Sequence, residues 1–390
     1  MRAKTSVDPA SRYYTQVTIH EGTNTTMKPL MNTHFIWGTL MLSLTFSNPV
    51  NSQESPYQTV DTAYELRMHG QANKARSMLV DLVIEEPSCA MAWYELARTR
   101  QHIALGDPRL MMSLMGPMQA ASAKAVKLEP DNYAYASYNA MVGMFVAYPA
   151  IMRNAPDLQQ KLDQAVDGYQ AVLKIQPNCP SSLLTLAEIY VYLDQTQGGY
   201  RNKVKSIAAR LETIDPAYGA KARELLLADD ADRVQFWKNA LAKNLENPDI
   251  QESLCRAELL FGEAEEAVTS LHSILKAYPE KTNLYLDFAR YYMIQGMRDE
   301  EKREEMFQNA QMYFDKYLEA DPVNPMKAWV MRAKATMARR SGNSEEGEAL
   351  LEQARRLDSF YSKASGVPPE ILFTRPGEAV PFHTYWFRYI

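Results

Sequence analysis

The chain has 390 residues and a formal net charge of −5, with 46% hydrophobic and 23% charged residues. These proportions are ordinary for a soluble globular protein. A negative charge without a Lys/Arg cluster argues against nucleic-acid binding. Glycine is scarce, at 16 residues, while Ala, Leu, Met, Glu and Lys are plentiful, which favours helix over sheet.

The first apolar segment is a nearly uncharged run over residues 35–46, FIWGTLMLSLTF. Its twelve residues are too few to span a bilayer but are typical of the hydrophobic core of a secretory signal peptide. Lys28 supplies a positive flank upstream. Val50 and Ser52 place small or aliphatic residues three and one positions before Gln53. The pattern predicts cleavage near Ser52.

We therefore expect a signal peptide over residues 27–52 and export of the mature protein, either to a periplasm or out of the cell. Because the apolar run begins more than thirty residues after the first residue, we expect translation to start at Met27 or Met31. Residues 1–26 would then be an extension of the reading frame or a disordered segment. The alternative is that the run is a buried part of the folded domain.

Downstream, a helix-stop signal recurs: an acidic, amide or tyrosine residue followed by proline. Proline just past a helix end cannot continue the helix, so each signal predicts the end of one helix and the approach of the next. The separations run from 31 to 47 residues, which suits pairs of helices. The signals are Glu86-Pro87, Glu129-Pro130, Gln176-Pro177, Asp215-Pro216, Asn247-Pro248, Tyr278-Pro279 and Asp321-Pro322.

Small and large apolar residues stand at constant distances from these prolines. Small residues are needed where two helices cross closely, and large ones fill the space beside the crossing. Glycine allows the left-handed turn between the helices. Twelve residues before the proline stand Ala75, Ala165, Ala267 and Ala310; eight before it stand Leu79, Tyr169, Leu271 and Phe314; seventeen before it stand Gly70 and Gly262; ten after it stand Ala97, Ala140, Ala187 and Ala289.

This arrangement resembles the tetratricopeptide repeat family. The closest matches are residues 56–89 and 248–281, and the resemblance covers most of residues 56–360. It implies an all-α solenoid of about seven to eight helix pairs over residues 53–360.

The sequence departs from the regular repeat in three ways, so we expect an irregular, locally bent solenoid. The connections at 106–118, 146–160, 194–202 and 297–309 are too long. The unit at 217–248 is short and has Leu226 in place of the small residue. The last unit, 328–360, ends without proline.

The pattern stops after Tyr361, and residues 362–390 contain four prolines and end in the aromatic run YWFRYI. An exposed cluster of that density is rarely left in water. We expect residues 361–390 to form a non-helical tail that caps the last helix pair, because terminal repeats need capping. The alternative is a docking peptide for another protein.

No pattern of catalytic or metal-binding residues is evident. The histidines form no HExxH motif, and Cys89, Cys179 and Cys255 form no CxxC or Cys/His spacing. The acidic runs, such as residues 229–232, lie within single segments rather than facing each other across a cleft. We therefore predict no enzyme activity, no cofactor and no metal.

In the tetratricopeptide repeat family the first helix of each pair lines a concave face that commonly receives a peptide. The resemblance therefore implies a candidate binding face rich in Tyr and Met, which suits an adaptable apolar groove with a few polar fixing points. The alternative is that this stripe is core. The residues are Tyr57, Tyr64, Met68, Tyr94, Arg98, His102, Met141, Met144, Phe145, Leu184, Glu188 and Tyr192.

The predicted function is an exported, non-enzymatic scaffold that binds a protein or peptide partner, with no transmembrane helix in the mature form. The alternative is a periplasmic accessory or solute-binding component associated with a transporter. That function would need a closed pocket for a small apolar ligand, near the connections at 106–118 and 146–160.

Overall fold

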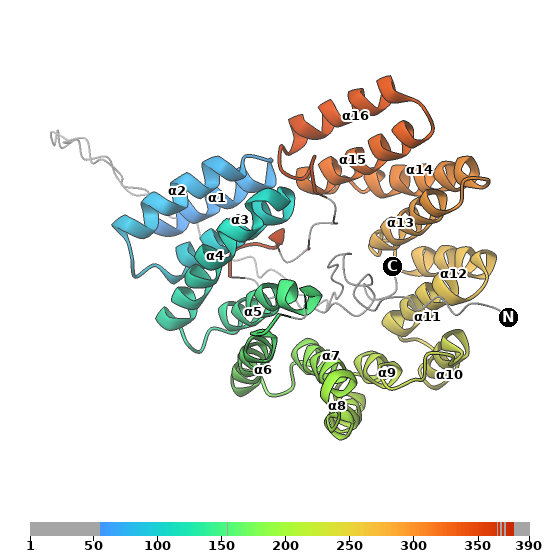
Figure 1. Cartoon of the computed structure of the whole chain (residues 1–390), viewed down its shortest axis with the longest axis horizontal. Helices are drawn as coiled ribbons and strands as arrows, with labels where there is room; N and C mark the ends of the chain where they lie inside the picture. The colour runs from blue at the N-terminus through green and yellow to red at the C-terminus, as the bar shows by residue number, and fades with distance from the viewer. Residues whose placement is uncertain (1–54, 154, 365, 367–368, 370–371, 378–390) are drawn as a thin grey trace, which may run out of the picture.

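The computed structural model describes residues 55–377, apart from 154, 365, 367–368 and 370–371 (Figure 1). The predicted signal peptide, its cleavage near Ser52 and the aromatic end of the tail lie outside the described residues. Predictions about translation start and export therefore stay predictions.

Sixteen helices and no strand occur in the described part of the chain, which confirms the predicted all-α class. The helices are α1 (Pro56–Met68), α2 (Ala72–Glu85), α3 (Ala90–Gly106), α4 (Pro108–Leu128), α5 (Tyr133–Arg153), α6 (Leu158–Ile175), α7 (Pro180–Gln197), α8 (Arg201–Ile214), α9 (Pro216–Glu224), α10 (Arg233–Lys243), α11 (Pro248–Phe261), α12 (Ala264–Ala277), α13 (Asn283–Arg298), α14 (Arg303–Glu319), α15 (Asn324–Arg340) and α16 (Ser344–Leu357).

Most helices pack against the next one as a hairpin, and the first helix of a hairpin can also contact the first helix of the next, as in α1 with α3 and α11 with α13. Figure 1 shows the hairpins following one another around a ring, so that α15 and α16 approach α1 and α2. The predicted series of seven to eight helix pairs is thereby confirmed at eight.

The small and large positions counted from the prolines form the core of each hairpin. The alanines at Ala75, Ala165, Ala267 and Ala310 are fully buried, and the large residues beside them are at most 2% exposed. Burying a side chain the size of Leu79 or larger contributes about 1.5–3 kcal/mol. Close helix crossings therefore occur where the spacing predicted them.

The structure contradicts the expectation of long connections at 106–118, 146–160, 194–202 and 297–309. Most of these residues extend helices instead: α4 and α5 have 21 residues each, and only three residues separate α7 from α8. Pro117 and Pro149 lie inside α4 and α5. Proline is a poor residue for a helix interior, but packing against neighbouring helices outweighs that penalty here.

Two of the helix-stop prolines are also helix starts. Pro216 and Pro248 are the first residues of α9 and α11, where proline loses no hydrogen bond. The preceding Asp215 and Asn247 cap these helices, each side chain accepting hydrogen bonds from two backbone N–H groups.

The fifth unit is the least regular. Helix α9 packs mainly on α8, and α10 packs mainly on α11, so the two helices of this unit contact each other little. Leu226 lies in the connection between them rather than at a helix crossing. The fully buried Trp237 of α10 fills the core of this unit.

The ring closes where the end of α16 meets the first two hairpins. The α1–α2 turn is so close to Leu357 that a Cβ on Gly70 would overlap the Leu357 carbonyl group, and a Cβ on Gly106 would overlap Phe360. Phe360 packs with Ala72 and other residues of these hairpins. The segment after α16 therefore joins the two ends of the solenoid.

The three cysteines are free thiols, and we expect them to differ in reactivity because they differ in burial. Cys179 and Cys255 are buried, and burial raises the pKa of the Cys255 thiol, whereas Cys89 is partly exposed. We expect a maleimide to label Cys89 first and Cys255 only on unfolding. Cys89→Ser should remove the fast phase, as mass spectrometry of labelled peptides would show; fast labelling of Cys255 would contradict its burial.

Candidate functional site

The twelve residues of the predicted binding face do not form one surface. Seven of them are buried, at most 7% exposed: Tyr64, Met68, Tyr94, Arg98, His102, Met141 and Leu184. Met144, Phe145, Glu188 and Tyr192 are partly buried, and Tyr57 is 60% exposed. The structure gathers Tyr64, Tyr94, Arg98 and His102 around the segment that follows α16, while Leu184, Met144 and Tyr192 belong to the core around α7.

A buried charge cluster lies between α1 and α3. Arg67 of α1 donates from Nε and Nη2 to Oε1 of Glu95, over 2.8 and 2.6 Å. Arg98 of α3 places Nη1 3.2 Å from Oε2 of the same carboxylate, and all three side chains are fully buried. One carboxylate thus fixes two guanidinium groups, which is the arrangement that makes buried charge tolerable.

The two arginines keep their charge in this environment. Burial lowers the pKa of Arg67, and the Glu95 carboxylate partly restores it. For Arg98, burial acts in the same direction, but Tyr94 and Glu95 outweigh it and the pKa is raised. Arginine stays protonated in proteins, so the cluster presents positively charged hydrogen-bond donors.

These donors hold the main chain of a turn in the C-terminal region, residues 372–374, in which the Leu372 N–H donates to the carbonyl oxygen of Pro369. Tyr64 Oη donates to the carbonyl oxygen of Phe373 over 2.6 Å. Arg67 Nη1 donates to the carbonyl of Leu372, and Arg98 Nη2 donates to the carbonyl of Thr374. Three consecutive carbonyl groups are therefore held by side chains of α1 and α3; we call Tyr64, Arg67 and Arg98 the carbonyl clamp.

Side chains of the same segment fill the space beside the clamp. Leu372 is fully buried in a cluster that includes Tyr94, Met118 and Met141. The Thr374 hydroxyl oxygen lies 3.1 Å from Arg98 Nη2 and accepts from it. The Arg375 guanidinium lies 5.9 Å from the Tyr64 ring centre and 3.8 Å from Glu65.

A second contact, between His102 and Asp358, fastens the chain directly after α16. His102 Nε2 lies 2.9 Å from Oδ2 of Asp358, and both side chains are fully buried. The other carboxylate oxygen accepts from the backbone N–H groups of Phe360 and Tyr361, over 2.8 and 2.9 Å. Burial is the main cause that lowers the pKa of His102. The imidazole is therefore neutral at pH 7, and the contact is a hydrogen bond from Nε2–H to the carboxylate.

The buried His102 should make the stability of the fold depend on pH. An unfolded chain binds a proton at His102 below its ordinary pKa of 6.5, whereas the folded chain keeps it neutral to lower pH. Stability should therefore fall as pH drops below about 6.5. Urea unfolding at pH 7.5 and 5.5 tests this. His102→Gln should reduce the loss of unfolding free energy between the two pH values. An equal loss in the variant would contradict a neutral buried His102.

The tyrosines around the clamp donate hydrogen bonds from their hydroxyl groups and pack through their rings. Tyr138 Oη donates to Oε1 of Gln101 over 3.0 Å, and burial raises the pKa of Tyr138 well above its usual value. The Tyr94 ring lies 4.9 and 5.2 Å from the ring centres of Tyr135 and Tyr138. Neutral hydroxyls and packed rings suit recognition of main chain and apolar side chains.

A related charge cluster occurs between α11 and α13. Arg256 Nε donates to Oδ2 of Asp287 over 2.7 Å, and Lys281 Nζ donates to Oε2 of Glu252 over the same distance. Arg290 follows Asp287 by three residues, as Arg98 follows Glu95, and burial lowers its pKa to about 10. The arrangement of α1 and α3 is thus repeated, in outline, on the opposite side of the ring (Figure 1).

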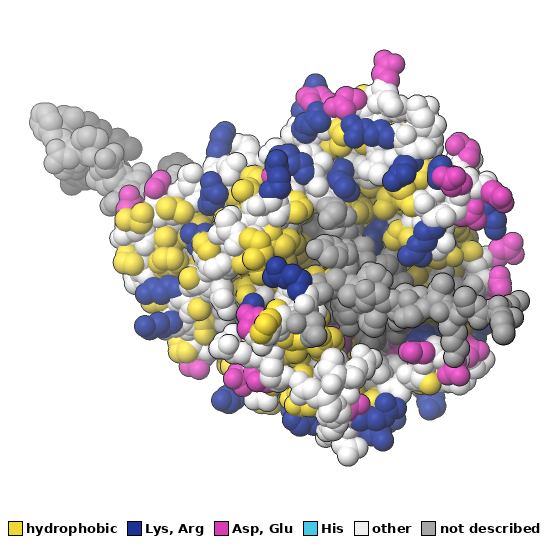
Figure 2. Space-filling view, in the orientation of Figure 1, with side chains coloured by type: hydrophobic (Ala, Val, Ile, Leu, Met, Phe, Trp, Pro, Cys, Tyr) yellow, Lys and Arg dark blue, Asp and Glu magenta, His cyan; other side chains and the backbone are white. Residues whose placement is uncertain are grey.

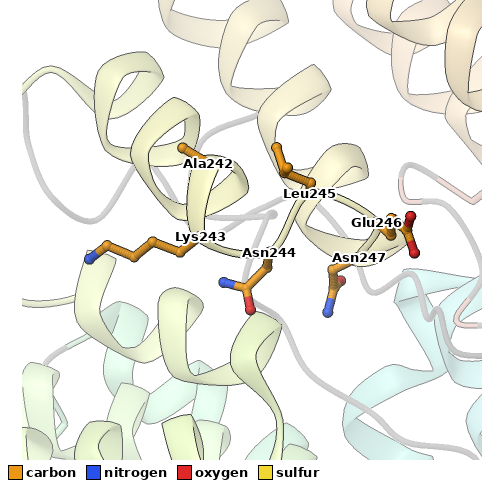
Figure 3. Close-up of a pocket in the computed structure, with 6 residues that line it drawn as sticks. All are labelled: Ala242, Lys243, Asn244, Leu245, Glu246 and Asn247. Atoms are coloured by element: carbon orange, nitrogen blue, oxygen red, sulfur yellow. The ribbon is translucent and has the colours of Figure 1, made fainter.

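A hollow of about 490 Å³ is lined by residues 242–247 (Figure 3). All its lining residues come from the end of α10 and the loop before α11, and Figure 3 shows their polar side chains pointing in different directions. It lies in neither of the connections, 106–118 and 146–160, where a pocket for an apolar ligand was expected. Among the described residues, no group of three or more His, Cys, Asp or Glu is placed to hold a metal ion.

On the surface, Figure 2 shows hydrophobic side chains gathered over the first hairpins. The large exposed hydrophobic residues of α2 and α4 are Ile84, Leu110 and Met112. Lys/Arg and Asp/Glu side chains alternate along the rim near α12 to α16. No helix among those described is both long and apolar enough to cross a membrane.

Arg67 and Glu95 belong to the site but were absent from the predicted face. Both are charged residues on helix faces that are otherwise apolar, and Glu95 precedes Arg98 by one helical turn. That spacing was the available signal for the cluster. The partner segment at 372–374 left no signal in the sequence, because main-chain carbonyl groups are common to all residues.

No protein-family model matches the chain, and no curated protein matches it by sequence. A tetratricopeptide repeat protein from Parabacteroides merdae aligns with a TM-score of 0.33 and 12% identity, covering 77% of this chain and 93% of that one. The human IFIT1 dimer with PPP-AAAA aligns with a TM-score of 0.34 and 16% identity, over 77% of this chain and 67% of that one. These structural neighbours are tetratricopeptide-type proteins, and the helical-repeat fold of this chain rests on its own packing.

Proposed function

We propose that this protein is a non-enzymatic scaffold that binds a short turn-forming segment of a protein or peptide partner between α1 and α3. The observation that carries the proposal is the carbonyl clamp, in which Tyr64, Arg67 and Arg98 hold three consecutive main-chain carbonyl groups of a turn. In peptide recognition, main-chain hydrogen bonds can supply affinity while side-chain pockets add specificity.

The energetics suit binding. A hydrogen bond from a charged donor contributes about 1.5–3 kcal/mol, and one from a neutral hydroxyl about 1 kcal/mol. Because Glu95 already orients both arginines, little side-chain entropy remains to be lost when a peptide arrives. The clamp is therefore preorganised to receive main-chain carbonyl groups.

The test is partner capture from the native source with matched tyrosine variants. Tyr64 Oη also holds the chain's own Phe373 carbonyl group, so both tyrosine variants are made in a chain whose Leu372→Asp change keeps residues 372–375 out of the clamp. There Tyr64→Phe removes one clamp donor and should weaken capture about fivefold, since it removes about 1 kcal/mol. Tyr57→Phe, on the exposed first turn of α1, is the control and should leave capture unchanged. Capture that ignores Tyr64, or no specific partner at all, would contradict the proposal.

We also propose that the scaffold acts outside the cytoplasm, with residues 27–52 as the signal peptide. The support is the apolar run at 35–46 with its upstream lysine and the small residues near Ser52. Mass spectrometry of the mature N-terminus should find a chain that begins near Gln53. A mature product that retains residues 1–40 would contradict export by this signal.

A further inference from the structure

We propose that the clamp between α1 and α3 selects turn-forming peptides whose sequence resembles residues 372–375, and that this segment occupies the clamp in cis until such a partner displaces it. The inference rests on the proposed function and deepens it. It names the ligand as two large apolar residues, a hydroxyl residue and a basic residue in a turn, the conformation that residues 372–374 have here. It also makes the chain's own segment the competitor.

The segment contacts the clamp as a ligand would. Its hydrogen bonds to the clamp join residues 276 to 309 positions apart in the chain, and in each of the three clamp bonds a carbonyl group of the segment accepts from a side chain of α1 or α3. A peptide supplied in trans could make the same three bonds, because they depend on main-chain geometry.

Each position of the segment meets different chemistry. Leu372 is fully buried in an apolar cluster that includes Tyr94, Met118 and Met141. Phe373 packs against the same cluster while partly exposed. An apolar pair is therefore favoured at these two places.

The next two positions favour polar residues. The Thr374 hydroxyl oxygen accepts from Arg98 Nη2 over 3.1 Å, so serine or threonine fits there. Arg375 lies over the Tyr64 ring and near the Glu65 carboxylate, which favours a basic residue. The order of these four sites fixes the direction in which a peptide lies.

Release of residues 372–375 need not open the ring. The chain just after α16 is fastened separately. There Asp358 binds His102, and Phe360 packs near Ala72 and Gly106. Tyr361 and Ala364 belong to the core of the last hairpins. Residues 372–375 can therefore leave the clamp while the contacts of residues 358–364 keep the ends of the solenoid together.

Cis occupancy sets the affinity for a partner. A tethered ligand acts at an effective concentration of the order of millimolar. The apparent dissociation constant of a competitor rises in inverse proportion to the fraction of molecules whose clamp is open, so that 99% closure weakens binding about a hundredfold. Weakening the cis segment should therefore strengthen binding in trans.

The test uses the full chain and a labelled synthetic peptide with the sequence of residues 369–377, PEILFTRPG. Leu372→Asp in the chain puts a carboxylate into the apolar site and should release the cis segment. By fluorescence anisotropy, this variant should bind the peptide at least about tenfold more tightly than the unaltered chain. A peptide carrying the same Leu→Asp change is the control and should not bind.

Two additional variants keep the test decisive. Tyr64→Phe in the Leu372→Asp background should weaken peptide binding about fivefold, while Tyr57→Phe in that background should not. If circular dichroism shows that Leu372→Asp disturbs the fold, Leu372→Ala takes its place with the same expected order of affinities.

Equal binding by the unaltered chain and the folded variant would overturn cis competition. Binding that ignores both Tyr64 and the Leu→Asp peptide would overturn the assigned ligand chemistry. A segment exchanged between two copies, seen as a dimer that Leu372→Asp dissociates, would replace the partner by a second copy and overturn the proposal. Failure of partner capture while the peptide still binds would count against the proposed function alone.

Discussion

Replacing Glu95 by alanine is expected to lower the free energy of unfolding by about 3–5 kcal/mol, because it leaves two buried arginines without their shared counter-charge. Arg67, Glu95 and Arg98 are fully buried, and the carboxylate is the group that orients both guanidinium groups. The variant should also lose the carbonyl clamp, since neither arginine would keep its direction. Urea unfolding followed by circular dichroism measures the first effect, and peptide binding measures the second.

The matched control is Glu85→Ala at the end of α2, where the side chain is exposed. Surface substitutions of this kind usually change stability by less than about 0.5 kcal/mol. If the two alanine variants were equally stable, the cluster of α1 and α3 would not be the buried charge network described above.

Replacing Gly70 by alanine is expected to separate the first and last hairpins. Gly70 has a φ of +76°, and a Cβ there would overlap the carbonyl group of Leu357. The left-handed backbone alone costs a non-glycine residue about 1–2 kcal/mol, and the overlap adds about 1–3 kcal/mol or forces the two hairpins apart. Small-angle scattering should show an enlarged particle, and the urea midpoint should fall.

Gly342 provides a control with the same backbone. It lies in the turn between α15 and α16 with a φ of +88°, but a Cβ there would meet nothing within 4 Å. Gly342→Ala should therefore show only the cost of the left-handed turn and an unchanged particle size. If both variants behaved alike, contact between the α1–α2 turn and the end of α16 would not hold the ring together.

Much of the helical framework could be predicted from residue spacing. Ala75 and Leu79 stand one helical turn apart on the same face of α2, so their distance from Pro87 placed a helix crossing correctly. The regular repeat spacing failed at 106–118 and 146–160, where long connections were expected but most residues extend α4 and α5, with Pro117 and Pro149 inside these helices.

The candidate site was predicted only in part. Tyr64, Arg98 and His102 were named because they lie on the first helices of their hairpins, and the structure brings them together at one place. Arg67 and Glu95 were missed because pattern reasoning treats a charged residue on an apolar helix as solvent-facing. Whether this surface receives a partner in addition to the chain's own segment stays a prediction.

By itself, the sequence determined the all-α class, the succession of helix pairs and the positions of their close crossings. These depend on residues within one or two helical turns and on the next helix along the chain. Only the tertiary structure decided that the solenoid closes and that residues 372–374 lie in the clamp between α1 and α3. The contact from Arg67 to Leu372 joins residues 305 positions apart, and its acceptor is a main-chain carbonyl group. Local periodicity carries no information about such a pair, so it depends on the path of all the hairpins between them.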